Sequence, residues 1–146
     1  MEILNKRAKF DYFIEEEIEA GIVLTGTEIK SIREGKCNIK DCYGVVKNNE
    51  VYLLNMYIAQ YKEGNIFNHE ETRSRKLLLH KKEIKRIQKA IDLNGFTLVP
   101  IKGYFKDNKF KILLGICRGK KNFDKRETIK DRDIKREVLK NIKSFK

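Results

Sequence analysis

The stretch Phe96–Cys117, FTLVPIKGYFKDNKFKILLGIC, indicates the fold more clearly than any other part of the sequence. Two runs rich in aromatic and β-branched residues, Phe96–Phe105 and Phe110–Cys117, flank the polar residues 106–109. Such runs favour strands, and Asp and Asn favour the turn between them. Pro100, the only proline, predicts an edge position or a bulge, because proline cannot donate a hydrogen bond within a sheet. We therefore predict a long β-hairpin.

A second hairpin is predicted upstream. Tyr43–Lys47 and Val51–Asn55 are strand-like and flank Asn48-Asn49. Asparagine tolerates positive φ better than most residues do, so this pair predicts a tight turn.

Two helices are predicted from the residues expected to begin and end them. Thr25 and Glu28 have the spacing of a capping box, and Gly35 follows at a suitable C-terminal position, which predicts a helix of about two to three turns. The second helix spans Lys82–Asn94 and ends at Gly95. Its apolar face comprises Ile84, Ile87 and Ile91.

The remaining body is less regular. Phe10–Ile14 predicts a strand, Glu15–Glu17 interrupts it, and Ile18–Leu24 resumes an apolar run. Gln60–Lys76 is polar and predicts a long loop, of the kind that is usually functional or disordered.

Several short antiparallel strands with two helices predict a mainly β fold, an OB-like antiparallel barrel over residues 1–117, because closure removes exposed strand edges. Residues 118–146 form a basic C-terminal tail, with 12 Lys and Arg against 5 Asp and Glu. The tail lacks enough apolar residues to fold alone, so we predict that it folds against a large anionic partner.

The composition suggests what that partner is. A net charge of +12 and a pI near 9.6 favour RNA, DNA or an anionic membrane surface. No apolar run approaches the roughly 20 residues that span a bilayer, and the N-terminus has no signal-peptide pattern. We therefore predict a cytoplasmic protein that binds RNA or single-stranded nucleic acid. A basic amphipathic tail on a membrane is a weaker alternative.

Catalytic motifs are weak. The sequence has neither a glycine-rich phosphate loop after a strand nor a serine nucleophile elbow. The carboxylates of Glu15–Glu17, Glu70 and Glu71 offer one enzymatic alternative, metal-assisted RNA cleavage. Runs of glutamate are more often solvated charge, so we predict no catalytic residues and no enzyme.

The cysteines and histidines do not predict a metal site. Cys37 and Cys42 are poorly spaced for zinc, and no second recognisable pair follows. We predict that Cys37, Cys42 and Cys117 are free thiols, that His69 and His80 are loop or surface residues, and that the protein needs no metal or cofactor.

Three segments carry a family resemblance: NKRAKFDYFIEEEIEAGIVLTGTEIKS (5–31), GNIFNHEETRSRKLLLH (64–80) and RGKKNFDKRETIKDRD (118–133). The chain resembles the small protein B family, the tmRNA-binding proteins of bacterial trans-translation. The resemblance implies a barrel that binds the tRNA-like domain of tmRNA (SsrA RNA) and escorts it to stalled ribosomes. The resemblance also implies an extended C-terminal tail. From its sparse apolar stripe and like charges we predict that this tail is disordered when free and helical on the ribosome, and we predict that the protein acts as a monomer on RNA. A different OB-like RNA-binding factor or ribosomal protein remains the alternative.

The resemblance also implies site residues. The tmRNA-binding candidates on the body are Asn5, Tyr12, Glu19, Leu78 and Lys111. The ribosome-binding candidates in the tail, expected to face the ribosomal RNA of the small subunit, are Gly119, Lys120, Lys121, Phe123, Asp124, Lys125 and Arg126.

Overall fold

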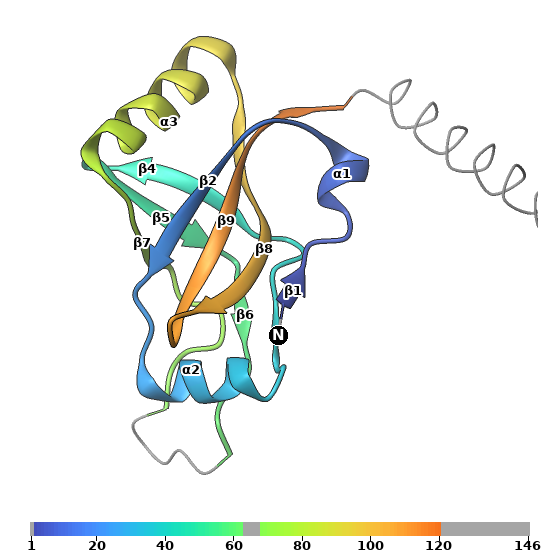
Figure 1. The fold of residues 1–146 in the computed structure, drawn as a ribbon, viewed down its shortest axis with the longest axis vertical. Coiled ribbons are helices and arrows are strands. Elements are labelled where there is room, and N and C mark those ends of the chain that lie inside the picture. The colour runs from blue at the N-terminus through green and yellow to red at the C-terminus, as the bar shows by residue number, and fades with distance from the viewer. Residues whose placement is uncertain (1, 63–67, 121–146) are drawn as a thin grey trace, which may run out of the picture.

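The computed structural model describes residues 2–62 and 68–120 of the chain. Helices lie outside a strongly curved sheet of antiparallel strands (Figure 1). In chain order the elements are β1 (Glu2–Leu4), α1 (Ala8–Asp11), β2 (Tyr12–Ile22), α2 (Gly26–Arg33), β3 (Cys37–Asn38), β4 (Tyr43–Lys47), β5 (Glu50–Leu54), β6 (Tyr57–Ile58), β7 (Arg75–Leu78), α3 (Lys81–Asn94), β8 (Thr97–Lys106) and β9 (Lys109–Gly119).

A 7-stranded sheet closes on itself to form the barrel. Its strand order is β1-β8-β4-β5-β7-β2-β9, and β9 also pairs with β8. β9 pairs along the length of β8, so β4 and β1 share the other edge of β8, where Leu98 is opposite Gly44 and Gly103 is opposite Ile3. The predicted mainly β, OB-like antiparallel barrel is confirmed.

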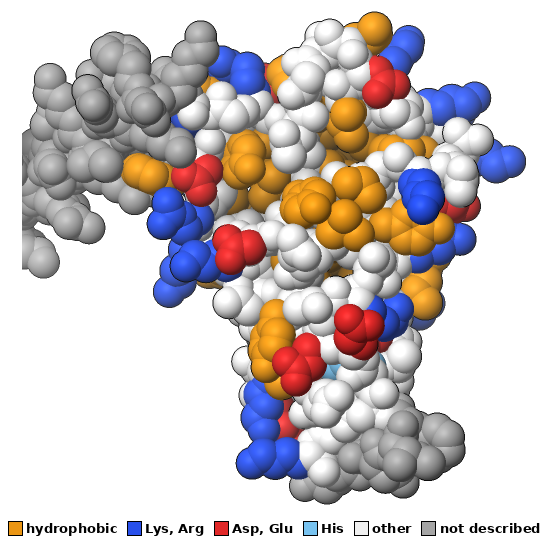
Figure 2. All heavy atoms as spheres, turned by 180° about the vertical axis from the view of Figure 1, so that it is seen from behind, with side chains coloured by type: hydrophobic (Ala, Val, Ile, Leu, Met, Phe, Trp, Pro, Cys, Tyr) orange, Lys and Arg blue, Asp and Glu red, His pale blue; other side chains and the backbone are white. Residues whose placement is uncertain are grey.

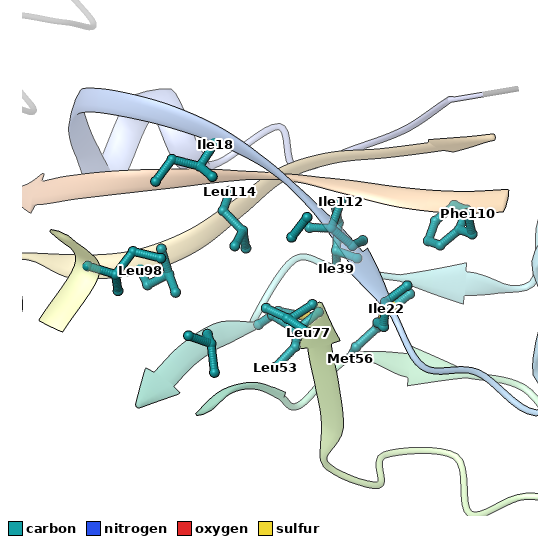
Figure 3. Close-up of a cluster of buried hydrophobic side chains, with 14 of the residues drawn as sticks. Ile18, Ile22, Ile39, Leu53, Met56, Leu77, Leu98, Phe110, Ile112 and Leu114 are labelled. Carbon is teal, nitrogen blue, oxygen red and sulfur yellow. The ribbon is translucent and has the colours of Figure 1, made fainter. Parts of the chain in front are cut away.

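The core lies inside the barrel and is apolar (Figure 3). Strand residues on the inner face alternate with outward ones, as period-2 geometry requires. The two longer helices lie at opposite ends of the barrel in Figure 1, where α2 contributes Ile32 and α3 contributes Ile84 and Ile87 to the same core. The buried strand residues labelled in Figure 3 include Ile18, Ile22, Leu53, Leu77, Leu98, Ile112 and Leu114.

Both predicted hairpins are confirmed. β8 and β9 turn at Asp107 and Asn108, with φ of 52° and 63°, and the register shifts between Pro100 and Lys102, which is the bulge that proline predicts. β4 and β5 turn at Asn48-Asn49, with φ of 52° and 61°. Local turn chemistry therefore fixes both connections.

Both predicted helices are also confirmed. At the start of α2, the Thr25 side chain accepts from the Glu28 N–H, and the Thr25 N–H donates to the Glu28 carboxylate at 2.8 Å. α3 begins one residue earlier than predicted and ends at Gly95, whose φ of 65° suits a residue without a Cβ.

The predicted break in the first long strand is wrong. Phe10 and Asp11 belong to α1, which packs the buried Ala8 against Val99 and Cys117. From Tyr12 the strand continues through Glu15–Glu17, with a bulge between Ile14 and Glu16. The extra residue disturbs the alternation, which is why the sequence pattern suggests an interruption.

Three further expectations change. β7 begins at Arg75, inside the predicted 60–76 loop, and the short strands β1, β3 and β6 are additions to the predicted set. His69 lies in a loop, as predicted, but it is buried: its Nδ1 lies 2.9 Å from Thr27 Oγ1 and its Nε2 2.9 Å from the Ile58 carbonyl oxygen. His80 is exposed, as predicted.

The three cysteines are free thiols, as predicted, and Cys42 and Cys117 are buried. Burial raises the pKa of Cys42 to about 12 and that of Cys117 to about 11, which keeps both protonated and unreactive. None of the helices in the described residues is long and apolar enough to span a membrane.

Candidate nucleic-acid interface

Two of the predicted RNA-binding residues share a row on the outer face of the barrel. Strand register places Leu78 opposite Gly21, Gly21 opposite Lys111, and Lys111 opposite Tyr104. Residues paired across strands project from the same face of a sheet. Leu77, adjacent to Leu78, is buried in the core, so the row points outward.

Leu78 is an unusual surface residue. Its side chain is 54% exposed, and it lies across Gly21, where an added Cβ would sit 3.2 Å from Leu78 Cβ. The absence of a side chain at Gly21 therefore lets Leu78 lie close to the strand that separates it from Lys111. Leu78 and Lys111 therefore present an apolar surface and a positive charge on the same outer face of the barrel.

Glu19 lies two residues before Gly21 on β2 and so shares the face of this row. The Tyr104 hydroxyl donates to the Glu19 carboxylate, and Lys106 Nζ lies 3.5 Å from the other carboxylate oxygen. The hydrogen bond from Tyr104 is the largest influence on the pKa of Glu19 and lowers it; desolvation opposes this, but the hydrogen bond and charge of Lys106 and the charge of Lys111 add to the lowering, and the net pKa is lowered. Glu19 is therefore a fixed carboxylate that can accept hydrogen bonds.

Tyr104 completes this network. Burial and the hydrogen bond to Glu19 raise the pKa of Tyr104 to about 12, so its hydroxyl stays protonated and keeps donating. Its role depends on a contact between residues 85 positions apart, which no local sequence pattern reports.

Asn5 and Tyr12 lie in a different region. Tyr12 begins β2, and Glu19 follows seven residues later, about 23 Å along the strand. The Asn5 amide is 7% exposed and donates to the carbonyl oxygens of Pro100 at 2.9 Å and Ile39 at 3.3 Å. Asn5 therefore holds the segment after β1 against the barrel.

Tyr12 is more accessible than Asn5. Both border a small pocket of about 260 Å³, together with Arg7, Lys40 and Tyr43. Asp11 and Asp41 also line the pocket, and Arg7 pairs with Asp11 at 3.5 Å. Lys40 beside the two tyrosine rings could contact the phosphate of an RNA nucleotide while a ring contacts its base. The structure thus separates the five body candidates into an outer row and a pocket.

The start of the predicted tail is bound to the barrel. β9 continues through Gly119, which pairs with Tyr12. The Lys120 N–H donates to the Asp11 carbonyl at 2.9 Å, and Lys120 Nζ donates to the Lys9 carbonyl at 2.8 Å. These contacts fix the point from which the remaining chain departs.

Phe13 strengthens this attachment. The Arg118 guanidinium lies 4.5 Å and Lys120 Nζ 4.8 Å from the centre of the Phe13 ring, both within cation–π range. Arg118 also pairs with Glu15 at 3.3 Å. The other tail candidates lie outside the described residues: Lys121, Phe123, Asp124, Lys125 and Arg126.

A buried ion cluster joins α2 to the start of β7. Glu28 and Arg75 are both 0% exposed, and Arg75 Nε donates to the Glu28 carboxylate at 2.5 Å. Arg73 binds the other carboxylate oxygen at 2.5 Å. Burial raises the pKa of Glu28, but the hydrogen bonds from Arg73, Thr25 and Arg75 outweigh this effect and lower it.

Arg75 also ties the β5–β6 connection to the segment that precedes β7. Its guanidinium donates to the carbonyl oxygens of Met56 at 2.6 Å, Arg73 at 3.1 Å and Glu71 at 3.2 Å. A buried charge needs partners of this kind, because an unpaired one costs several kcal/mol. The capping-box pattern predicts only the local role of Glu28.

Two of the glutamates that suggested a nuclease form ion pairs on the barrel surface. Glu15 pairs with Arg118 and Glu16 with Arg86. Within residues 2–62 and 68–120 no group of three or more His, Cys, Asp and Glu side chains could hold a metal ion.

Comparison with known proteins identifies the family. The family model described as SmpB protein matches residues 2–144. The chain is 55% identical to the SsrA-binding protein of Shouchella clausii over 139 residues, which cover 95% of this chain and 89% of that protein. It is 54% identical to the SsrA-binding protein of Staphylococcus aureus strain JH1 over 140 residues, covering 96% and 91% respectively.

A solved structure agrees with these sequence matches. The fold resembles a chain of "tmRNA-SmpB: a journey to the center of the bacterial ribosome", with a TM-score of 0.70 and 43% sequence identity. The match covers 88% of this chain and 94% of that one. The chain therefore belongs to the SmpB family.

Proposed function

We propose that this protein binds the tRNA-like domain of tmRNA and delivers it to stalled ribosomes, so that the nascent chain is tagged by trans-translation. The observation that carries the proposal is the 55% identity, over 95% of the chain, to a protein named SsrA-binding protein. The solved structure that combines tmRNA, SmpB and the ribosome supports both partners. A net charge of +12 suits binding to RNA.

The outer row supplies the main RNA contacts in this proposal. Lys111 is placed to neutralise a phosphate, and Leu78 is placed to pack on a base or a sugar. Glu19 accepts from a base amino group or a 2′-hydroxyl, since its carboxylate is held in place by Tyr104 and Lys106. Tyr12 contacts an unpaired base, and Asn5 positions the pocket wall.

Replacing Lys111 with alanine is expected to weaken binding of the tRNA-like domain and to reduce the slope of log K against log salt by about 0.7–0.9, the value for one phosphate contact. Glu19→Ala is expected to weaken binding with little change in slope, because Glu19 neutralises no phosphate. Binding titrations at several salt concentrations measure both effects.

Two results would count against this assignment. An unchanged affinity and slope for Lys111→Ala would remove Lys111 from the interface. A Glu19→Ala protein that no longer folds, judged by circular dichroism, would make the role of Glu19 structural.

We further propose that the protein has no catalytic activity of its own, acts as a monomer on RNA, and works in the cytoplasm with the ribosome. Labelled RNA incubated with the protein and Mg²⁺ or Mn²⁺ should remain intact. Appearance of cleavage products would favour a nuclease instead.

The partner itself can be identified directly. RNA that co-purifies with the tagged protein from its native cell should be strongly enriched in tmRNA. Recovery of bulk tRNA or ribosomal RNA without tmRNA would favour a general RNA-binding factor.

A further inference from the structure

The outer row continues beyond Tyr104 onto the N-terminal strand. Strand register places Glu2 of β1 opposite Tyr104, so one row of paired residues crosses five strands, from β1 through β8, β9 and β2 to β7. Figure 1 shows β1 beside β8, with β9 and β2 following. β1 therefore belongs to the same curved outer face as the residues that the proposed function assigns to RNA.

A second row runs parallel to the outer row, two residues away along each strand. Leu4 of β1 lies opposite Lys102. Lys102 in turn lies opposite Leu113, and Leu113 lies opposite Glu19. Neighbouring residues of a row are about 5 Å apart and the two rows about 7 Å apart, since these are the spacings of strands and of alternate residues. RNA bound to the outer row is therefore within reach of the second row.

Leu4 resembles Leu78 in its exposure. The side chain of Leu4 is 55% exposed and that of Leu78 is 54% exposed, and both project from the outer face. A leucine exposed on a strand at the end of a sheet is a liability for the free protein, because such strands invite pairing with other chains. A partner that covers Leu4 would remove this liability.

Lys102 adds a cation to the same face. Its Nζ lies 3.7 Å from a carboxylate oxygen of Glu2 and 5.5 Å from the centre of the Tyr104 ring. An exposed ion pair of this kind contributes little to stability, so a phosphate can replace Glu2 at small cost. Leu4 and Lys102 thus repeat, on β1 and β8, the combination of leucine and lysine that Leu78 and Lys111 form.

β1 is held firmly enough to present Leu4. Before it, Ile3 packs against the core. After it, the Asn5 backbone N–H donates to the Ile101 carbonyl oxygen at 2.9 Å, and the buried Asn5 side chain donates to the Pro100 carbonyl oxygen at 2.9 Å. Leu4 lies between these anchors, so little backbone freedom is lost when a partner binds there.

We propose that the interface with the tRNA-like domain extends onto β1, where Leu4 packs on a sugar or a base and Lys102 contacts a phosphate. The inference rests on the proposed function. Its basis is continuity, because both residues lie on the face that carries Glu19 and Lys111.

Binding titrations of the tRNA-like domain with the full-length protein test the role of Leu4. Leu4→Ala should weaken binding by about fivefold or more, because apolar surface is no longer removed from water in the complex. The salt slope should not change. Leu4→Met should keep the affinity of the unsubstituted protein, since methionine retains a flexible apolar side chain.

Lys102→Gln tests the phosphate contact. It should weaken binding and reduce the slope of log K against log salt by about 0.7–0.9, the value for one phosphate. A measurement without any substitution accompanies these variants. The methyl signals of Leu4 in nuclear magnetic resonance spectra should shift when the tRNA-like domain is added, whereas those of Leu93 on α3 should not.

The controls must account for net charge. Lys and Arg side chains also project on the side of the molecule opposite to that of Figure 1, as Figure 2 shows, so any loss of charge weakens attraction to RNA somewhat. Lys89→Gln and Leu93→Ala are the matched controls on the exposed side of α3, where Leu93 is 75% exposed. Both should bind the tRNA-like domain within about twofold of the unsubstituted protein.

Three results would overturn the proposal. The first is equal loss of binding by Lys89→Gln and Lys102→Gln, which would leave only a net-charge effect. The second is unchanged binding by Leu4→Ala together with unshifted Leu4 methyl signals. The third is normal RNA binding by Leu4→Ala with loss of self-association in sedimentation, because a second copy of the chain would then cover β1.

Failure of the proposed function would look different. An unsubstituted protein that binds bulk tRNA as tightly as the tRNA-like domain would refute that function. The same variants titrated with bulk tRNA would then still decide whether Leu4 and Lys102 belong to the RNA-binding face.

Discussion

Replacing Glu28 with alanine is expected to destabilise the barrel by about 3–5 kcal/mol, the cost of leaving a buried charge without its partner. The substitution leaves the Arg75 guanidinium, which is 0% exposed, with carbonyl oxygens but no counter-charge. It also removes the capping contact at Thr25. Chemical denaturation gives the free energy of unfolding.

The same pair predicts a pH dependence. The pKa of Glu28 is lowered from its usual value of 4.5, so the ionised carboxylate stabilises the folded state above that value. This stabilisation is lost as the pH falls below 4.5, and the Glu28→Ala protein should lack that part of the acid sensitivity.

Glu50→Ala is the matched control. Glu50 forms an exposed ion pair with Lys76 at 3.6 Å, and such pairs contribute about 0–1 kcal/mol. A Glu28→Ala protein no less stable than the Glu50→Ala control would show that the buried pair does not hold the barrel together.

Removing the chain from Glu127 onward is expected to abolish tagging of stalled nascent chains while leaving binding of the tRNA-like domain within about twofold. The sequence of this segment predicts a helix that begins at Thr128, where Asp131 completes a cap. Its apolar stripe comprises Ile134, Val138, Ile142 and Phe145. A reconstituted tagging reaction and a binding titration measure the two effects.

The physical reason is coupled folding. A helix of this length is marginal in water without tertiary support, and its lysines and arginines repel one another. Contact with ribosomal RNA would screen those charges and give the stripe a surface to cover. Normal tagging by the shortened protein would refute the role of the tail. Strong amide protection across residues 134–142 in the free protein would refute the coupled folding alone.

The parts of the fold that sequence reasoning predicts are those set by neighbours in the chain. Asn48-Asn49 and Asp107-Asn108 adopt positive φ in tight turns, and Thr25 caps α2 through Glu28, three residues away. Gly95 ends α3 in the same local way. Each of these features depends on a handful of consecutive residues.

Sequence reasoning misses the parts of the fold that depend on contacts between distant residues, or on a strand whose alternation of buried and exposed side chains is disturbed. α1 replaces the start of a predicted strand where the buried Ala8 packs on Val99 and Cys117. The bulge after Ile14 disturbs the alternation that would have revealed one continuous strand through the glutamates.

The candidate site likewise contains residues that the sequence predicts and residues that it does not. Glu19, Leu78 and Lys111 were selected from the family resemblance, and strand register places them on one outer face. The groups that position or extend the site were not predicted, because Tyr104 reaches Glu19 across 85 residues and Arg75 reaches Glu28 across 47. Such pairings leave no local pattern in a single sequence.

The most direct test of the central proposal is a competition between the tRNA-like domain of tmRNA and bulk tRNA for the purified full-length protein, repeated across a salt titration. Specific recognition predicts that the tRNA-like domain is retained at salt concentrations that release bulk tRNA, because base and shape contacts persist where phosphate contacts are screened. Release of both RNAs at the same salt concentration would contradict the proposal and leave only general electrostatic binding to RNA.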